Sequence, residues 1–506
     1  MPSIQKSYSN ILKNNPLTMK KIFILLLTIF YLKSDGQNEI DALRYSQENI
    51  LGSARLSSMA GSFGALGGDF SSLSFNPAGI GLYQSNEFSF SPIANINTTT
   101  SYFNNNNILN KQRNLNMNHF GLIYTSPIQD NNFGWKRINL GVGWNQIASY
   151  ERKITISGEN NTSSLADKML EIAQNNTINQ LNPLNTELAF WTDLIDLSNN
   201  TVDTTLQDPW YTHDNGNYIS HISSNSNKRQ IKRILSSGNK GEYVFSFGGS
   251  LNEKIYVGAT IGMPSINYYE QAYYSEIVLE DTINNLSSFD FNEELTTQAS
   301  GINIKIGTII RISEQLKIGG NIHSPTLYNI QENYASSLTT YFENQNTTEY
   351  SPYNYFEYEL LTPWKAAISA STIINKNILI NADYELIDYS SIEMSSNSYD
   401  FILENEEIMN SFSKANNIKI GSEINLQAIV LRFGYAIYGS PYLEEQFTRK
   451  DFSYGIGIRN KNYFIDLAYV LSQNNEHHKL YSEDYINPIS LVNTNHNLIF
   501  TLGFRY

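Results

Sequence analysis

The sequence predicts an all-β membrane protein, built as a 14-stranded antiparallel transmembrane β-barrel. Three observations predict this class: a composition rich in aromatic residues and poor in charge, a period-two alternation of apolar and polar residues, and connections that are alternately short and long. Alternation with period two places successive side chains on opposite faces of a strand. A transmembrane barrel needs one apolar face toward lipid and one polar face toward its lumen.

Composition already excludes several classes of protein. Hydrophobic residues make up 41% of the 506 residues and aromatic residues 13%, yet only 16% are charged and the mean hydropathy is −0.34. A typical soluble domain carries about 25% charged residues. Only one stretch approaches the roughly 20 apolar residues of a spanning helix, which excludes a helical membrane protein. The absence of cysteine excludes disulfides and thiol chemistry, and a net charge of −14 speaks against a nucleic-acid partner.

The alternation runs through most of the chain, from about Phe88 to Tyr506. In one run, Ile302, Ile304 and Ile306 alternate with Asn303, Lys305 and Gly307. The same pattern occurs at 138–144, 243–249, 255–261, 316–322, 364–370, 378–386, 418–424, 429–435, 452–458 and 463–469. A soluble β-sandwich would alternate in the same way with its apolar face inside, so alternation alone leaves both folds open.

The connections between the runs favour the barrel. Short connections occur at 250–254, 313–315, 375–377, 425–427 and 460–462. Long polar connections lie between them, at about 96–116, 158–241, 282–298, 333–354, 390–414, 440–451 and 474–493. Tight periplasmic turns that alternate with long outer loops are the layout of a bacterial transmembrane barrel. We therefore expect fourteen strands over residues 88–506, with both chain ends in the periplasm.

The last strand supports the same class. Leu498, Phe500, Leu502, Phe504 and Tyr506 form an alternating apolar face that ends in an aromatic residue at the C-terminus. This strand resembles the closing strand of bacterial outer-membrane barrels, and we expect the protein in that membrane. A soluble edge strand with the same pattern is the alternative.

The N-terminus carries an export signal. The eleven-residue run 22–32 is almost wholly apolar and follows Lys20 and Lys21. It is too short for a stable span and fits the core of a secretory signal peptide. We expect residues 1–36 to be this signal, with Met19 as the true start and cleavage near Gly36. A membrane anchor is the alternative.

Residues 37–87 do not alternate and are dominated by small side chains. Gly52, Ala54, Arg55, the run 59–61, the run 65–69 and above all Asn76-Pro77-Ala78-Gly79 resemble the FadL/TodX family of outer-membrane transporters. That family carries long-chain fatty acids and other hydrophobic compounds. In it, this motif lies in an N-terminal hatch that plugs a fourteen-stranded barrel, in agreement with the strand count. The resemblance implies that residues 37–87 form a hatch.

The resemblance also implies a function, the uptake of hydrophobic compounds such as long-chain fatty acids. We expect loop residues to collect the ligand, an interior pocket beside the hatch to hold it, and movement of the hatch to release it. The residues expected to gate are Gly61, Gly64, Gly67, Gly68, Asn76, Pro77 and Ala78. Exit sideways through the barrel wall is a further implication.

Loop 158–241 contains two amphipathic segments that predict small outer helices. Ser163 or Ser164 can cap the first, and Asn182-Pro183 can start the second. Their apolar faces would carry Leu165, Met169, Ile172, Leu188, Trp191 and Ile195, which are candidates for substrate contact. The alternative is that these side chains only pack against each other and the barrel rim.

Three lysines on the polar face of neighbouring strands, Lys305, Lys317 and Lys365, could converge on a carboxylate head group. The alternative is a set of structural ion pairs in the lumen. The residues available for such pairs are Asp383, Glu385, Glu423 and Asp466, with Lys419, Arg432, Arg459 and Arg505.

Other functions remain as alternatives. Uptake of haem or of an aromatic compound would use the same architecture, and His119, His323 and His496 lie in or beside strands. A general porin would need no hatch. We expect no enzyme activity and no cofactor, because the sequence lacks a nucleophile motif and a metal-ligand set. The expected partners are a hydrophobic small molecule, outer-membrane lipid and the barrel-assembly machinery, and the protein should act as a monomer.

Overall fold

The computed structural model describes residues 39–49, 51–128, 134–198, 217–280, 285–444, 448–482 and 485–506. The expected signal peptide, with Met19, lies outside these described residues. The described residues belong to one compact unit, Glu39–Tyr506. No helix in the described ranges has the length and apolar character needed to cross a membrane.

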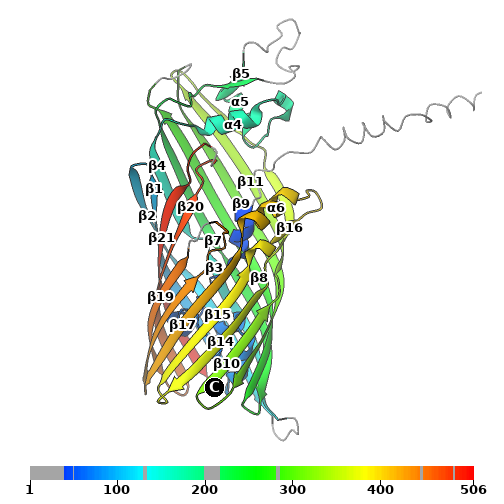
Figure 1. Ribbon diagram of the computed structural model, residues 1–506, viewed down its shortest axis with the longest axis vertical. Coiled ribbons are helices and arrows are strands. Elements are labelled where there is room, and N and C mark those ends of the chain that lie inside the picture. The colour runs from blue at the N-terminus through cyan, green and yellow to red at the C-terminus, as the bar shows by residue number, and fades with distance from the viewer. Residues whose placement is uncertain are drawn as a thin grey trace, which may run out of the picture. The chain divides into compact units, whose positions relative to one another are not determined.

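Fourteen antiparallel strands close into a barrel (Figure 1). They are β1 (Glu87–Phe103), β2 (Asn106–Pro127), β3 (Trp135–Ser149), β7 (Lys228–Leu251), β8 (Ile255–Val278), β9 (Leu286–Arg311), β10 (Leu316–His323), β14 (Lys365–Ile374), β15 (Ile378–Asp388), β17 (Lys414–Leu426), β18 (Ile429–Tyr438), β19 (Arg449–Arg459), β20 (Tyr463–His478) and β21 (Ile489–Arg505). Each pairs with the next in this order, and β21 pairs with β1 to complete the ring. The predicted strand number is confirmed.

The lower part of the barrel carries an apolar belt on its outside. Ile304 and Ile368 are 52% and 66% exposed, whereas the alternate residues Asn303 and Lys305 are 4% and 3% exposed. Apolar side chains thus point outward and polar ones inward, the reverse of a soluble sandwich. This arrangement suits a barrel surrounded by hydrocarbon.

Above the belt, several predicted loops are strands. Residues 96–116 form the upper halves of β1 and β2, joined by a tight turn at Asn104 and Asn105. Most of 282–298 likewise belongs to β9. Above the membrane both faces of a strand contact water or polar neighbours, so the sequence there lacks the apolar face by which we recognised strands.

The upper wall also contains strands outside the ring of fourteen. They are β4 (Arg152–Asn160), β11 (Leu327–Phe342), β12 (Asn346–Tyr350), β13 (Asn354–Leu361) and β16 (Glu393–Ser395). β11 pairs with β9, β13 with β11, and β16 with β13. The wall is therefore tall over β7–β9 and β11, and lower where β14, β15 and β17 end (Figure 1).

Small elements decorate this upper rim. They are α4 (Leu165–Ala173), η3 (Ile178–Gln180), α5 (Thr186–Trp191), the two-stranded sheet of β5 (Ile195–Leu197) and β6 (Tyr218–Ser220), η4 (Tyr389–Ser391) and α6 (Ile402–Ser411). Ser164 caps α4 as predicted, through a capping box with Asp167. The second predicted helix does not start at Asn182-Pro183; α5 begins later, with Asn185 as its N-cap, because Pro183 lies in a turn.

The remaining described residues, 39–49 and 51–86, are called the hatch segment. It contains α2 (Glu39–Ser46), α3 (Ala54–Ser58), η1 (Phe70–Ser74) and η2 (Pro77–Leu82), drawn in dark blue within the barrel in Figure 1. Ser53, Asp69 and Asn76 cap α3, η1 and η2 through their side chains. These short polar residues start each turn at the point where the chain changes direction.

Candidate functional site: the hatch segment inside the barrel

A single carboxylate on the barrel wall holds the middle of the hatch segment. Asp383, on β15, accepts hydrogen bonds from the backbone N–H of Phe63 over 2.7 Å and of Gly64 over 3.1 Å. The neighbouring Asn381 donates to Ser62 Oγ over 2.7 Å. The wall thus satisfies the backbone of a turn that has no secondary structure of its own.

The predicted gating glycines form the bends of this turn. Gly61, Gly67 and Gly68 have φ angles of +71°, +63° and +65°. A Cβ on Gly67 would lie 2.6 Å from Gly79 Cα, so this position requires glycine both for its backbone and for close approach. Gly64 lies against the wall, because its Cβ would meet Ser369 Oγ at 1.9 Å.

The Asn76-Pro77-Ala78 turn packs against bare backbone on the wall. Asn76 donates to the carbonyl of Gly64 over 2.6 Å and accepts from the N–H of Ala78 over 3.1 Å. A Cβ on Gly307 would lie 1.8 Å from Asn76 Oδ1, and one on Gly258 would lie 2.2 Å from the carbonyl oxygen of Pro77. Gly258 and Gly307 are paired neighbours on β8 and β9. The motif therefore fits a glycine-lined site.

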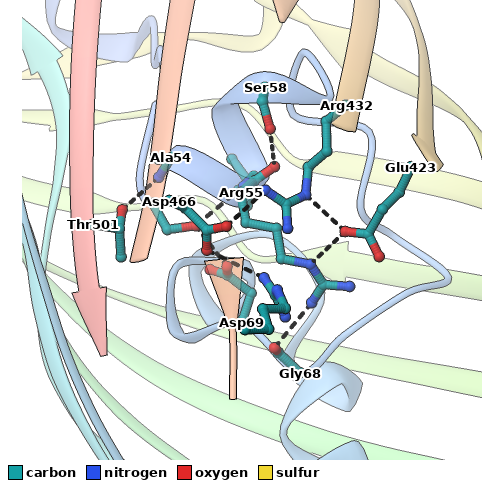
Figure 2. A network of polar contacts seen from close by, with 12 residues as sticks. Ala54, Arg55, Ser58, Gly68, Asp69, Glu423, Arg432, Asp466 and Thr501 are labelled. Carbon is teal, nitrogen blue, oxygen red and sulfur yellow. Dashed lines mark hydrogen bonds and ion pairs between the residues drawn. The ribbon is translucent and has the colours of Figure 1, made fainter. Parts of the chain in front are cut away.

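Charged side chains hold α3 to the opposite wall (Figure 2). Arg55 Nε contacts Glu423 over 3.1 Å, and Arg55 Nη1 donates to the carbonyl of Gly68 over 3.2 Å. Arg432, which is fully buried, joins Glu423 and Asp466 over 2.7 and 2.8 Å. One arginine of the hatch segment thereby enters an ion network of the wall, so moving α3 would leave Glu423 with fewer cations.

Two of the three candidate lysines form ion pairs with carboxylates. Lys305 contacts Glu242, and Lys365 Nζ lies 2.5 Å from Glu48. Lys317 has no carboxylate within ion-pair distance in the described part of the chain and lies near Arg55 instead. The structure does not bring the three lysines to one point free of counter-ions. The structural ion pairs that we considered as the alternative are present, Lys419 with Glu385 among them.

Glu48 is the carboxylate of the hatch segment in this group. Burial alone would raise the pKa of its carboxyl, but Lys365, Lys240 and Lys305 outweigh burial and hold that pKa well below its usual range. The carboxylate is therefore ionised inside the barrel. It fixes the chain just after α2 to β7 through Lys240 and to β14 through Lys365.

A cluster of tyrosines lies around α2, above the ion pairs. The Tyr45 ring centroid is 6.4 Å from that of Tyr150 and 6.1 Å from that of Tyr268, and Lys240 Nζ lies 5.2 Å from the Tyr328 ring centroid. Tyr45 donates to Thr297 Oγ1 over 2.8 Å. Within the described residues, the buried hydroxyls of Tyr150 and Tyr328 have no hydrogen-bond partner. The tyrosine cluster thus combines buried aromatic rings with a few polar groups.

The candidate loop residues pack into a cap over the barrel. Leu165, Met169, Leu188 and Ile195 are buried in one cluster with Phe289 and other rim residues, while Ile172 is half-buried. Ile195 lies on β5, not on a helix as we expected. Trp191 remains 45% exposed. Of the six, Trp191 presents the most surface to a ligand arriving from outside.

The three histidines considered for haem are hydrogen-bonded separately. His119 pairs with Ser89 Oγ over 3.1 Å, His323 donates to the carbonyl of Phe75 over 2.6 Å, and His496 pairs with Tyr469 OH over 2.6 Å. Within the described ranges, no three His, Asp or Glu side chains are arranged to hold a metal ion.

A cavity of about 790 Å³ lies on the outside of the wall, not in the lumen. Outward side chains of the apolar belt line it, among them Trp135, Phe247 and Ile306. Gly249, Gly320 and Thr308 leave the space, because their side chains are small. Because belt residues line it, this cavity opens to the same surroundings as the apolar belt.

The sequence did not reveal Asp383, Glu48 or the glycine-lined site as partners of the hatch segment. Asp383 was one of several inward carboxylates, and nothing in its spacing separates it from Glu385. Gly258 and Gly307 do carry a signal, since both occupy inward positions of alternating strands where polar side chains are expected. Glycine at such a position indicates close approach of another backbone.

Comparison with solved structures decides the fold. The Pseudomonas putida toluene transporter TodX matches with a TM-score of 0.50 at 10% identity, covering 90% of this chain and 99% of that one. A Pseudomonas aeruginosa FadL homologue matches with a TM-score of 0.52 at 10% identity, covering 90% and 98%. The fold is that of the FadL and TodX barrels. No protein-family model and no curated protein matches the sequence.

The FadL/TodX fold accounts for the order of parts seen here. An N-terminal segment fills the lumen, and fourteen strands surround it. The resemblance noted in Asn76-Pro77-Ala78-Gly79 is confirmed at the level of fold. At 10% identity the match leaves the ligand to be argued from this chain's own residues.

Proposed function

We propose that this protein is a bacterial outer-membrane channel for the uptake of hydrophobic compounds, gated by the hatch segment. One observation carries the proposal: an outward apolar belt surrounds a lumen that is filled by hydrogen-bonded chain, beneath an apolar cluster of tyrosines. An aqueous pore would need an open, polar lumen. Apolar ligands gain roughly 25 cal/mol for each Å² withdrawn from water, which favours a dry site of this kind.

The path starts at the rim and ends at the hatch segment. Exposed Trp191 would make first contact, with Leu165, Met169, Ile172, Leu188 and Ile195 behind it in the cap. The tyrosine cluster around Tyr45 would hold the ligand. Release would need movement of the hatch segment at its bends, Gly61, Gly67 and Gly68, and at its wall contacts, Gly64 and the Asn76-Pro77-Ala78 turn.

Sideways exit has one structural candidate. The pairing of β3 with β7 shifts register between Gln146 and Ala148, and the carbonyl of Ile147 accepts a hydrogen bond from Asn49 N–H over 2.6 Å. Here a wall strand bonds to the hatch segment where its own ladder is interrupted. We propose that displacement of Asn49 opens the wall at this bulge.

The ligand class follows from the cluster. TodX is a toluene transporter and the second neighbour is a FadL homologue, so aromatic hydrocarbons and fatty acids are the two classes to test. Of the three candidate lysines, Lys305 and Lys365 are paired with carboxylates, and Lys317 alone forms no ion pair within the described residues. This favours a neutral ligand over a fatty acid. The protein would act as a monomer in outer-membrane lipid, placed there by the barrel-assembly machinery, without a cofactor or catalysis.

The test is extraction of the detergent-purified protein followed by mass spectrometry, with binding of toluene and of oleate measured on the same preparation. We expect a co-purified apolar compound and measurable binding of at least one ligand. A matched variant, Tyr328→Ala, should weaken binding while the control Tyr353→Ala, at an exposed site, should not. A large ion conductance at rest with no ligand bound would identify a general porin instead.

A further inference from the structure

Helix α6 presents one side to the protein and leaves apolar residues on the other. Ile408 is fully buried and Phe401 is 1% exposed, within the same cluster as Leu43 and Tyr45 of α2. On its outer side Ile402 is 62% exposed and Met409 60% exposed. These two residues are seven positions apart and so lie on one flank of the helix. Glu404, Glu407 and Ser411 occupy the other flank.

The hydrogen bonds of α6 set its height on the barrel. Asn405 Nδ2 donates to the carbonyl of Met394 and Asn405 Oδ1 accepts from Met394 N–H, both over 2.8 Å. Met394 pairs with Leu360 on β13. The next residue along β13, Leu361, pairs with Leu327, which pairs in turn with Ile302 of the apolar belt. One residue of a strand spans about 3.4 Å, so the middle of α6 lies close to the upper edge of the belt.

The end of α6 gives the same height. The helix leads through Phe412 into β17, whose outward residues change from Lys414 to Ile418 within five positions. Lys414 pairs with Asp388 at the top of the wall, whereas Ile418 is 49% exposed in the belt. Figure 1 shows α6 on the flank of the barrel above β15, where the wall is low.

A second loop extends the apolar patch. Leu443 N–H donates to the carbonyl of Ser411 over 2.9 Å, and Leu443 is 59% exposed. Ile402, Leu403, Met409 and Leu443 thus form an exposed patch that continues the lipid-facing belt upward, here called the α6 patch. The helix carries three glutamates and no basic residue. Attraction to anionic lipid therefore does not explain the patch, and apolar contact does.

We propose that α6 is an interfacial helix whose α6 patch rests in the outer leaflet of the membrane, at the level where head groups meet hydrocarbon. Amphipathic helices of this kind lie in the membrane plane with their apolar side turned to the acyl chains. The buried side of α6 contacts the tyrosine cluster and α2. The helix would therefore contact lipid with one side and α2 of the hatch segment with the other. The inference rests on the proposed membrane location of the barrel.

The experiment measures depth by spin labelling. The chain has no cysteine, so a single cysteine can be introduced into the full protein at Ile402, Met409, Glu407, Leu386 or Tyr353. Each labelled protein is placed in phosphatidylcholine vesicles, and collision of the label with oxygen is compared with collision with a water-soluble nickel chelate. Leu386 lies in the belt and Tyr353 is 87% exposed above it, so they provide the two references.

We expect the oxygen-to-nickel ratio at Ile402 and Met409 to fall between the ratios at Leu386 and Tyr353, and the ratio at Glu407 to match Tyr353. A ratio at Ile402 and Met409 equal to that at Tyr353, with Leu386 in lipid, would overturn the interfacial helix alone. A water-exposed Leu386 would instead overturn the membrane location. Two independent label sites on the same flank keep the test decisive if one labelled variant does not fold.

Discussion

The carboxylate of Asp383 accepts the backbone N–H of Phe63 over 2.7 Å, which joins the barrel wall to the turn of the hatch segment. The same carboxylate also accepts from Gly64 and from Asn381. A buried carboxylate with several donors holds its partners tightly. Asp383 is thus the wall residue on which the closed position of the turn most directly depends.

Replacing Asp383 by asparagine should loosen the hatch segment. Asparagine offers one acceptor oxygen, so either the N–H groups of Phe63 and Gly64, which share Oδ2, or the amide of Asn381, which donates to Oδ1, lose their acceptor at a cost of about 1–3 kcal/mol. We expect more frequent open events in planar bilayers than for the unchanged protein. Asp388→Asn is the control, because Asp388 pairs with exposed Lys414 at the rim. Equal conductance of all three proteins would contradict the assigned role.

The glycine-lined site predicts a contrast between two alanine substitutions on neighbouring strands. Gly307→Ala would place a methyl group 1.8 Å from Asn76 Oδ1, whereas the atom nearest to a Cβ on Gly320 is 3.8 Å away. Overpacking costs about 1–3 kcal/mol. Amide hydrogen exchange in residues 61–82 should therefore accelerate in Gly307→Ala and stay unchanged in Gly320→Ala. Similar protection in both variants would argue against the fit.

Acid should weaken the docking of the hatch segment through Glu48. Its pKa is lowered in the folded protein by Lys365, Lys240 and Lys305 despite burial. A lowered pKa contributes stability above the ordinary value of about 4.3, and this contribution is lost as pH falls through the folded value. The protection factors of residues 39–49, which correct for the slower intrinsic exchange in acid, should stay constant from pH 7 to about pH 4.3 and fall below it. Glu48→Gln should show less of this pH dependence, and an identical pH response in the variant would exclude Glu48 as its source.

The cap predicts that two apolar residues of one loop act differently. Met169 is 3% exposed, so Met169→Ala should destabilise the cap by about 2–5 kcal/mol, seen as faster hydrogen exchange in α4 and α5. Trp191→Ala should leave exchange nearly unchanged but slow the association of oleate or toluene, measured by stopped flow. Unaltered association in Trp191→Ala would remove this residue from the path of the ligand.

The sequence was sufficient for the membrane part of the fold and insufficient above it. The sequence alone predicted that Ile302, Ile304 and Ile306 face outward, because a strand in hydrocarbon needs an apolar residue at every second position. Residues 96–116 lack this alternation, so the sequence predicted a loop where the structure has strands. Helix α4 was predicted from Ser164, whose side chain caps it. Helix α6 gave no start signal, since its N-cap Phe401 has a φ of 45° and makes no capping bond.

The hatch segment was found by its motif, but its partners were not. Asn76 and Pro77 predict a turn from the sequence alone, because both residue types favour turns. Gly307 lies 231 positions from its partner Asn76, and Asp383 lies 320 positions from its partner Phe63. No local rule relates residues so far apart along the chain. Contacts between distant segments depend on how the barrel closes, which a single sequence does not state.

The wall of the barrel has a tall side over β7–β9 and a low side over β14, β15 and β17. The ligand would enter at the cap beside Trp191, where α5 packs on β11 of the tall side, while α6 covers the tyrosine cluster on the low side above β14, β15 and β17. In a densely populated membrane, a neighbouring molecule packed against the low side would press on α6 and slow passage of the ligand to the tyrosine cluster without touching the hatch segment. Transport per molecule would then fall as copies accumulate, even though every copy remained intact.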